Sequence, residues 1–150
     1  MNTNSYLGRG INDYLYAKKS MKDENVYDYN WPAIICSQAV EKILKSVIEA
    51  EFADDSSCIA LLRTHNLRTV VAKILTKFPE SKLSSKDCKW LGDFYYDARY
   101  PGDDYITVSK EDAEEALLIV ERTLAAVEKI LCSEESKQLF KHYKERVSML

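Results

Sequence analysis

Apolar residues recur every three or four positions along most of the chain, which is the spacing of one face of an α-helix. This spacing predicts helices over about residues 5–20, 31–52, 67–78, 84–100 and 109–131, with a further helix in the tail from residue 133. No stretch alternates as a strand does. Several connections are short, so we expect an all-α fold, an antiparallel up-and-down bundle of five to six helices.

The second of these segments has the clearest pattern. Its wide apolar stripe includes Ile35, Ala39, Ile43 and Val47. A polar set lies off this stripe: Ser37, Gln38, Glu41, Lys42 and Lys45. Within it, Glu41 precedes Lys45 by four residues, the favourable order for a helical ion pair.

Residues that favour helix ends stand at the predicted boundaries. Asn30 precedes Trp31-Pro32 and is expected to cap the second helix, and Thr64 or Asn66 is expected to cap the third. Ser84 and Ser109 are each followed three residues later by an aspartate, an arrangement typical of helix N-termini. Proline residues at 79 and 101 are expected to end the third and fourth helices.

Composition places the chain among globular proteins. Its 150 residues suit one domain, and 46% of them are hydrophobic and 30% charged. Charges interrupt every apolar run, and the N-terminus has no basic start followed by an apolar stretch, so we expect neither a transmembrane span nor a signal peptide and predict a cytoplasmic protein. The four cysteines are too far apart for a zinc-binding spacing and are expected to be reduced structural thiols.

The net charge of −3 argues against strong nonspecific binding to nucleic acid. The charges are unevenly distributed, however. Residues 56–79 contain four basic and no acidic residues, whereas residues 103–121 are strongly acidic. Two readings remain open: solvated helix faces of opposite sign, or a basic surface for an anion and two poles that pair in a dimer.

Few residues suggest cofactor or metal chemistry. The glycines form no phosphate-binding loop, and His65 and His142 are too few for a histidine-rich metal centre. No cofactor and no metal are therefore predicted. His65 stands just before the third helix, where its unprotonated ring nitrogen could accept a hydrogen bond from a free backbone N–H group.

The segment FYYDARYPGDDYI, residues 94–106, surrounds Arg99 with aromatic residues and ends on a proline. Pro101 is expected to end the helix after Tyr100, which puts Arg99 in the last turn, where the helix dipole favours a cation. Arg99 then pairs either with a carboxylate of the bundle, such as Glu41 or Asp97, or with the phosphate of a ligand whose base is covered by a tyrosine.

Three patches occur in an informative order. SQAVEKILKSVI lies in the second helix, RTHNL precedes the third and ARYP ends the fourth, before the acidic sequence EDAEEALLIV. Over about residues 5–131 this order resembles the prokaryotic HEPN domains that are often encoded beside minimal nucleotidyltransferases. Residues 57–62 and the tail 133–150 look like additions to a single domain that covers residues 1–150.

The resemblance implies a helical bundle, commonly dimeric, with a polar groove. By position, the matching ligand-binding residues are Gln38, Glu41, Lys42, His65, Arg99 and Tyr100. Nuclease members of the family carry an arginine followed, after four residues, by a histidine, but this sequence contains no such pair and has Asp104 at the position reckoned from Arg99. Because that histidine is the general acid or base of the reaction, we expect no ribonuclease activity.

Three functions remain as hypotheses. The first is a non-catalytic HEPN-like module that binds a nucleotide or phosphorylated ligand, a nucleotidyltransferase partner, or both, in a toxin–antitoxin-like or substrate-binding pair. The second is a ribonuclease with a displaced active site. The third is a purely structural dimerisation bundle. A homodimer is expected, since a short bundle in which many tyrosines are exposed has apolar surface to spare and aromatic residues are enriched in interfaces.

Overall fold

The computed structural model describes residues 1–25, 28–98 and 107–150, apart from the side chains of residues 95–97. These residues contain no strand and form seven helices: α1 (Tyr6–Met21), α2 (Asn30–Glu51), α3 (Cys58–Arg63), α4 (Leu67–Lys77), α5 (Ser85–Asp97), α6 (Lys110–Glu128) and α7 (Glu134–Ser148). The predicted all-α class is confirmed. Six helices are those of the hydrophobic pattern, and the seventh is the short α3, which the expected number of five to six did not include. No helix in the described part of the chain is long and apolar enough to cross a membrane.

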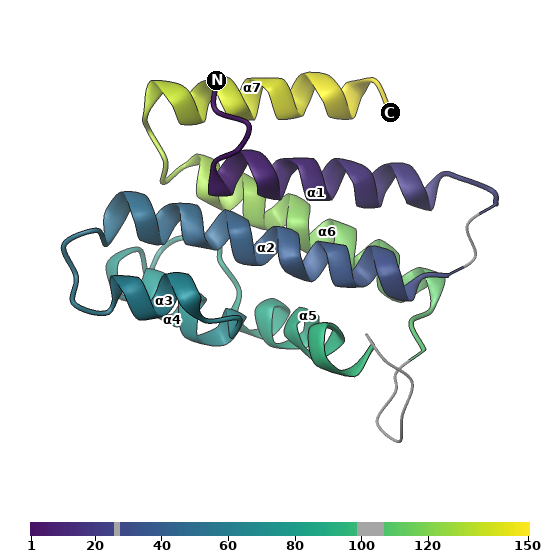
Figure 1. Ribbon diagram of the computed structural model, residues 1–150, viewed down its shortest axis with the longest axis horizontal. Helices are drawn as coiled ribbons and strands as arrows, with labels where there is room; N and C mark the ends of the chain where they lie inside the picture. Colours follow the sequence, from purple (N-terminus) through teal and green to yellow (C-terminus); the bar gives the residue numbers. More distant parts are fainter. Residues whose placement is uncertain (26–27, 99–106) are drawn as a thin grey trace.

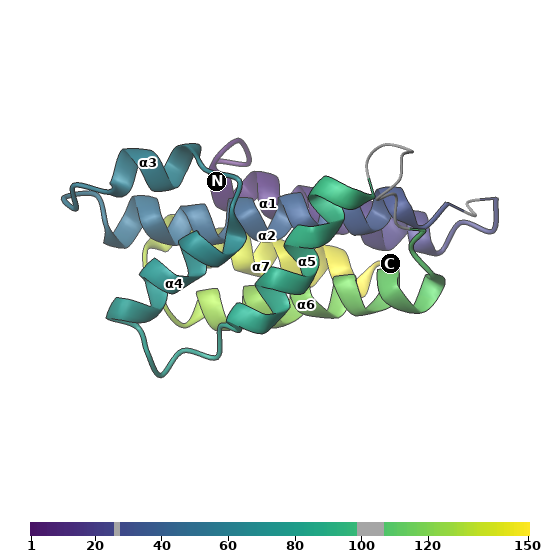
Figure 2. The same ribbon diagram turned by 90° about the horizontal axis from the view of Figure 1, so that it is seen from below.

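Helix α2 lies at the centre of the bundle (Figure 1) and contacts α1, α3, α4, α5 and α6. Helices α1 and α2 run antiparallel, and α6 and α7 do the same, as expected for an up-and-down bundle. Helix α7 covers the outer side of α1, whereas α3, α4 and α5 lie on the opposite side of α2. Seen from below (Figure 2), α5 is inclined to the long axis that α2 and α6 share.

Most predicted helix starts are confirmed by their capping contacts. The side chains of Asn66 and Ser84 accept hydrogen bonds from backbone N–H groups in the first turns of α4 and α5. Ser109 and Asp112 form a complete capping box at the start of α6. The predicted cap of α2 is wrong, because α2 begins at Asn30 itself and its N-cap residue, Tyr29, makes no capping hydrogen bond through its side chain. Helix α5 ends at Asp97, earlier than the proline at 101 had suggested.

Part of the polar set of α2 is buried in the bundle. Ser37 and Lys45 are buried, with 3% and 4% of their surface exposed. The reason is that α2 packs against α1 and α6 on one side and against α4 and α5 on another, so that little of its circumference meets water. Helical periodicity finds one apolar stripe, but a central helix is covered on more than one face.

Helices α1 and α2 approach closely at Gly10. A Cβ atom at this position would lie 2.7 Å from Ile43 Cγ1 and 3.1 Å from the Ala39 carbonyl oxygen. Real Cβ atoms essentially never lie as close as the first distance, so the glycine sets how near the two helices can come. This contact holds α2 in the position from which it presents Glu41 and Lys45 to the opposite side of the bundle.

Candidate functional site

Glu41 is the centre of a small charged cluster on α2. Its carboxylate accepts a hydrogen bond from Lys45 Nζ at 3.0 Å, and His65 Nδ1 lies 3.1 Å from its other oxygen. Only 5% of the Lys45 side chain and 14% of the Glu41 side chain are exposed. A buried ammonium group needs such a partner, so Glu41 compensates the charge of Lys45 while it holds the imidazole ring. The predicted pair of Glu41 and Lys45 is thereby confirmed.

At the start of α4, the side-chain cap comes from one residue and the Nδ1 atom of His65 has another partner. Asn66 provides the cap of α4 through its side-chain oxygen, which accepts from the N–H of Thr69 at 3.2 Å. The Nδ1 atom of His65 instead faces both carboxylate oxygens of Glu41, at 3.1 and 3.2 Å. A carboxylate can only accept, so Nδ1 carries the proton and donates it. This contact with α2 orients the ring of His65, which lies between α3 and α4.

The other α2 residues of the predicted set separate into two directions. Lys42 forms an ion pair with Asp13 of α1, so it points towards the α1 side of the bundle. Glu41, one position earlier, points towards the start of α4. Gln38 is half-buried, one turn before them. The structure therefore brings Glu41 and His65 together and adds Lys45 to them, but it does not bring Lys42 into the same cluster.

Arg99 and Tyr100 lie outside the described residues, as do the expected aromatic packing around Arg99 and the position of Asp104. The residues on either side are held by a side chain of α2. Asn30, 6% exposed, donates from Nδ2 to the Ala98 carbonyl oxygen at 3.3 Å and accepts at Oδ1 from the Val108 N–H at 2.9 Å. One buried amide at the start of α2 thus fixes both ends of the segment that carries the Arg-Tyr-Pro sequence.

A cavity of about 190 Å³ lies beside His65, between the start of α4 and the face of α5. Its lining includes Arg68, Lys89, Gly92 and Asp93. A Cβ atom added at Gly92 would meet no other atom within 4 Å, so the glycine leaves open space here. Arg68 and Lys89 have exposed side chains and form no ion pair with any residue that the structure describes.

The basic segment 56–79 divides into two parts. Lys73 pairs with Asp55 at 2.8 Å and Lys77 with Glu51 at 3.1 Å, at the far end of α2. The hydrogen bond from Lys73 holds the pKa of the Asp55 carboxyl well below its usual range. Arg63 and Arg68, in contrast, flank His65 and have no carboxylate within ion-pair distance among the described residues. In the lining of the cavity, Arg68 and Lys89 therefore stand against a single carboxylate, that of Asp93.

Cysteine and metal chemistry find little support at this site. Burial raises the pKa of Cys88, which lines the cavity, to about 12, and has the same effect on Cys36. Thiols with such pKa values are protonated and poorly nucleophilic near neutral pH. Across residues 1–25, 28–98 and 107–150, no three His, Cys, Asp or Glu side chains gather as the ligands of a metal ion.

Sequence reasoning missed Asn30, Lys45, Arg68 and Lys89 as site residues. Lys45 had a usable signal, since it follows Glu41 by one helical turn. Asn30 had none, because its partners lie at Ala98 and Val108, far along the chain. Arg68 and Lys89 come from different helices, and only the packing of α4 on α5 makes them neighbours of one cavity.

Comparison with known protein families supports the resemblance. The model of the HEPN domain matches residues 3–130, from just before α1 to just after α6. Helix α7 lies beyond the matched residues. No curated protein and no solved structure matches the chain. The match covers far more than half of the 150 residues, and the chain therefore belongs to the HEPN domain family.

Proposed function

We propose that this HEPN domain is a non-catalytic module that binds a nucleotide or another phosphorylated ligand at the cavity beside His65. The observation that carries the proposal is the pair of unpaired cations, Arg68 and Lys89, on either side of that cavity. A guanidinium group presents two parallel N–H donors to phosphate oxygens, and a lysine adds a compact positive charge. Both groups lie on regular helices, which hold them at a defined separation.

The size of the cavity supports a phosphate group rather than a whole nucleotide. Its volume of about 190 Å³ is below the roughly 300–1,000 Å³ of typical small-molecule pockets. The phosphate would occupy the cavity, and the remainder of the ligand would lie on the surface towards the end of α5. Arg99 and Tyr100 follow that end directly, and we propose them as the residues that contact the rest of the ligand.

Glu41 and Lys45 support this site without being its main anion ligands. Their charges compensate each other, and Glu41 orients His65 at the rim of the cavity. The contact of Glu41 with His65 is the one observation that favours the alternative, a ribonuclease with a displaced active site, because a carboxylate that orients an imidazole is a common element of general acid–base catalysis. The missing Arg-x-x-x-x-His sequence favours the non-catalytic function.

The test is a thermal-shift series with AMP, ADP and pyrophosphate. A ligand at about 100 times its Kd stabilises the folded state by about 2.7 kcal/mol. For a chain of this size that corresponds to a rise in Tm of roughly 5–10 °C. Arg68→Ala and Lys89→Ala should leave the Tm of the ligand-free protein unchanged and remove the rise. Lys86→Ala, at an exposed position of α5 outside the cavity, is the matched control and should keep it.

Arg99→Ala separates the two proposed partners of Arg99. If Arg99 pairs with a carboxylate of the bundle, its loss should destabilise the fold by on the order of 3 kcal/mol. If it pairs with the ligand, the Tm of the ligand-free protein should stay nearly unchanged while the ligand-induced rise disappears. RNA cleavage by the purified protein without metal, abolished by His65→Ala, would replace the binding module by the nuclease.

We further propose a homodimer and a nucleotidyltransferase partner. Among the described residues, large apolar side chains are exposed on α1, α2, α3 and α6: Tyr16, Trp31, Ile59 and Leu118. Exposed apolar groups of this kind are suited to interfaces. The expectation that tyrosines in general are exposed needs correction, since Tyr14 is fully buried and packs edge-to-face on Tyr143. A monomeric mass by light scattering at micromolar concentration would contradict the dimer.

A further inference from the structure

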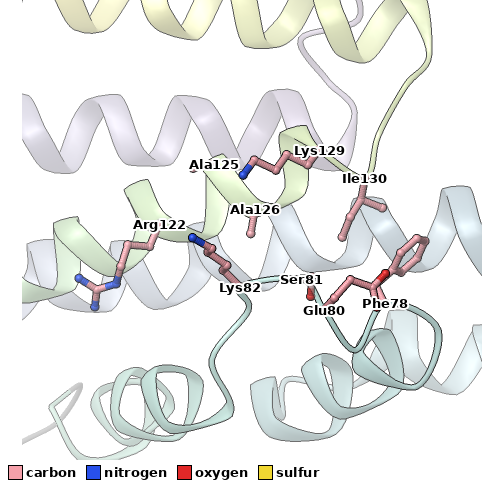
Figure 3. A pocket seen from close by; sticks show the side chains of 9 residues that line it. All are labelled: Phe78, Glu80, Ser81, Lys82, Arg122, Ala125, Ala126, Lys129 and Ile130. Carbon is pink, nitrogen blue, oxygen red and sulfur yellow. The ribbon is translucent and has the colours of Figure 1, made fainter.

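A second and larger cavity lies on another side of the molecule. It has a volume of about 360 Å³ and is enclosed by the connection between α4 and α5 and by the second half of α6 (Figure 3). Its volume falls within the usual range for small-molecule sites, roughly 300–1,000 Å³. It shares no lining residue with the cavity beside His65, so it is a separate feature of the fold.

The two sides of this cavity provide an apolar surface. Ala125 and Ala126 come from α6 and Ile130 follows its end, and Phe78, at the end of α4, lies on the opposite side (Figure 3). Phe78 is only half-buried, so part of its ring remains available for contact. Alanines next to an aromatic ring leave a flat space, which suits a planar apolar group better than a branched chain.

Charged side chains surround this surface, and most of their charge is positive. Lys82 extends from the connection between α4 and α5 towards α6 (Figure 3). Lys129 stands at the C-terminal end of α6. Neither lysine forms an ion pair within the described residues. Arg122 also lines the cavity, but Asp87 at 3.1 Å and Glu115 at 2.9 Å already hold its guanidinium group.

The charge balance of the cavity fits one negative charge. Apart from Arg122, which is held by two carboxylates outside the lining, the lining has two lysines and one carboxylate, Glu80, which leaves a single positive charge. Ser81 adds a neutral hydroxyl group whose oxygen is buried and has no hydrogen-bond partner in the described part of the protein. Such a group is stabilised by a ligand that accepts or donates a hydrogen bond.

We propose that this cavity binds a small organic monoanion with a flat apolar body, that is, an arylcarboxylate. The ring lies between Phe78 and the alanines of α6, and the carboxylate lies between Lys82 and Lys129. A bare phosphate is a poorer ligand, because it would leave the apolar surface uncovered and the fork-shaped donor of Arg122 is already occupied. The bound ligand bridges α6 and the segment between α4 and α5. This site is independent of the phosphate site proposed beside His65.

The proposal is tested with naphthoate and its neutral counterpart naphthamide in a heteronuclear NMR titration of the full chain. We expect naphthoate to shift the backbone signals of residues 78–82 and 122–130 and to bind at least about tenfold more tightly than naphthamide, since hydrogen bonds to charged groups are the stronger ones. The double variant Lys82→Ala/Lys129→Ala should weaken naphthoate by about tenfold or more and leave naphthamide unchanged.

Two further variants sharpen the test. Ala125→Trp, at an exposed position, fills the cavity and should abolish the binding of both compounds. Lys110→Ala removes an exposed lysine from the start of α6, outside the cavity, and should change neither affinity. Circular dichroism establishes that each variant is folded.

Several outcomes would overturn the proposal. Equal affinity for naphthoate and naphthamide would mean that the lysines recognise no anion. If Lys110→Ala weakens naphthoate binding as much as the double lysine variant does, only the overall charge of the protein matters. The absence of shifts at residues 78–82 and 122–130 would mean that no arylcarboxylate binds there. A change in particle mass on Ala125→Trp would mean that a second copy of the chain covers the cavity instead.

Discussion

Replacement of Asn30 by alanine is the perturbation for which the structure makes the strongest statement. Asn30 is almost fully buried at the first position of α2. Its side-chain amide joins two residues that are far from it in sequence, Ala98 after α5 and Val108 before α6. Alanine keeps the helix but removes both hydrogen bonds. It leaves the Ala98 carbonyl and the Val108 N–H without the partner that the amide provides.

The magnitude follows from these two contacts. The bond from Val108 N to Oδ1 is 2.9 Å long and close to ideal, whereas the bond from Nδ2 to the Ala98 oxygen, at 3.3 Å, is longer and weaker. A buried backbone group that loses its partner costs about 1–3 kcal/mol. We therefore expect Asn30→Ala to lower the free energy of unfolding by about 2–4 kcal/mol, which corresponds to roughly 6–12 °C in Tm for a chain of this size.

The assay is urea unfolding followed by far-UV circular dichroism, in which the midpoint should fall at an unchanged slope. Asn30→Asp is the informative second variant. It keeps an acceptor for Val108 but places an anionic oxygen against the Ala98 carbonyl, so it should be at least as destabilising as alanine. Limited trypsin digestion reports on the segment itself, and cleavage after Arg99 should accelerate in both variants more than cleavage after Lys110.

Asn66→Ala is the matched control, because it also removes an asparagine side chain that bonds a backbone N–H group. Asn66 is exposed, and loss of its cap should cost only about 1 kcal/mol. If Asn30→Ala costs no more than Asn66→Ala and leaves the cleavage after Arg99 unchanged, the long-range role of Asn30 is refuted.

The remaining predictions concern glycines and thiols. Gly10→Ala should destabilise the protein by about 1–3 kcal/mol, because its Cβ would lie 2.7 Å from Ile43 Cγ1. Gly92→Ala, which meets no atom within 4 Å, should instead stabilise α5 by roughly 0.5–1 kcal/mol; urea midpoints that move in the same direction would contradict this pair. Ellman's reagent should modify exposed Cys132 rapidly near neutral pH and the buried Cys36 and Cys88 only on unfolding, and Cys132→Ser should remove the fast phase. Because burial raises the pKa values of Cys36 and Cys88 from 9.0 to about 12, the unfolded chain loses these protons first as the pH rises. The contribution of these thiols to stability should therefore be complete below about pH 9 and be lost between pH 9 and 12; a urea midpoint that is constant over this range would be the contrary result.

The helices and their starts were predictable from the sequence because the forces that form them are local. The capping contacts of Asn66, Ser84 and Ser109 reach only three residues ahead. The ion pair of Glu41 with Lys45 spans one turn of the same helix. Hydrophobic spacing likewise depends only on the 3.6-residue period. Together these local signals also gave the order of patches by which the chain resembles the HEPN family.

The surroundings of α2 depended on the tertiary structure instead. Lys45 and Ser37 lie off the apolar stripe of α2, and they are buried because other helices cover more than one face of α2. His65 stands next to a helix start in the sequence, and only the tertiary structure shows that a carboxylate from α2 lies 3.1 Å from its Nδ1 atom. Such contacts depend on the angles and distances between helices, for which a single sequence carries no periodic signal.

The sequence by itself thus determined which segments are helical, where most of them begin and which family the chain resembles, since each of these depends on residues close together in the chain. Only the tertiary structure decided that Asn30 joins the ends of α5 and α6, that Arg68 and Lys89 line one cavity, and that Lys82 and Lys129 line another. Helix packing brings together residues that are twenty to nearly eighty positions apart, and the chemistry of both cavities arises from these long-range neighbours.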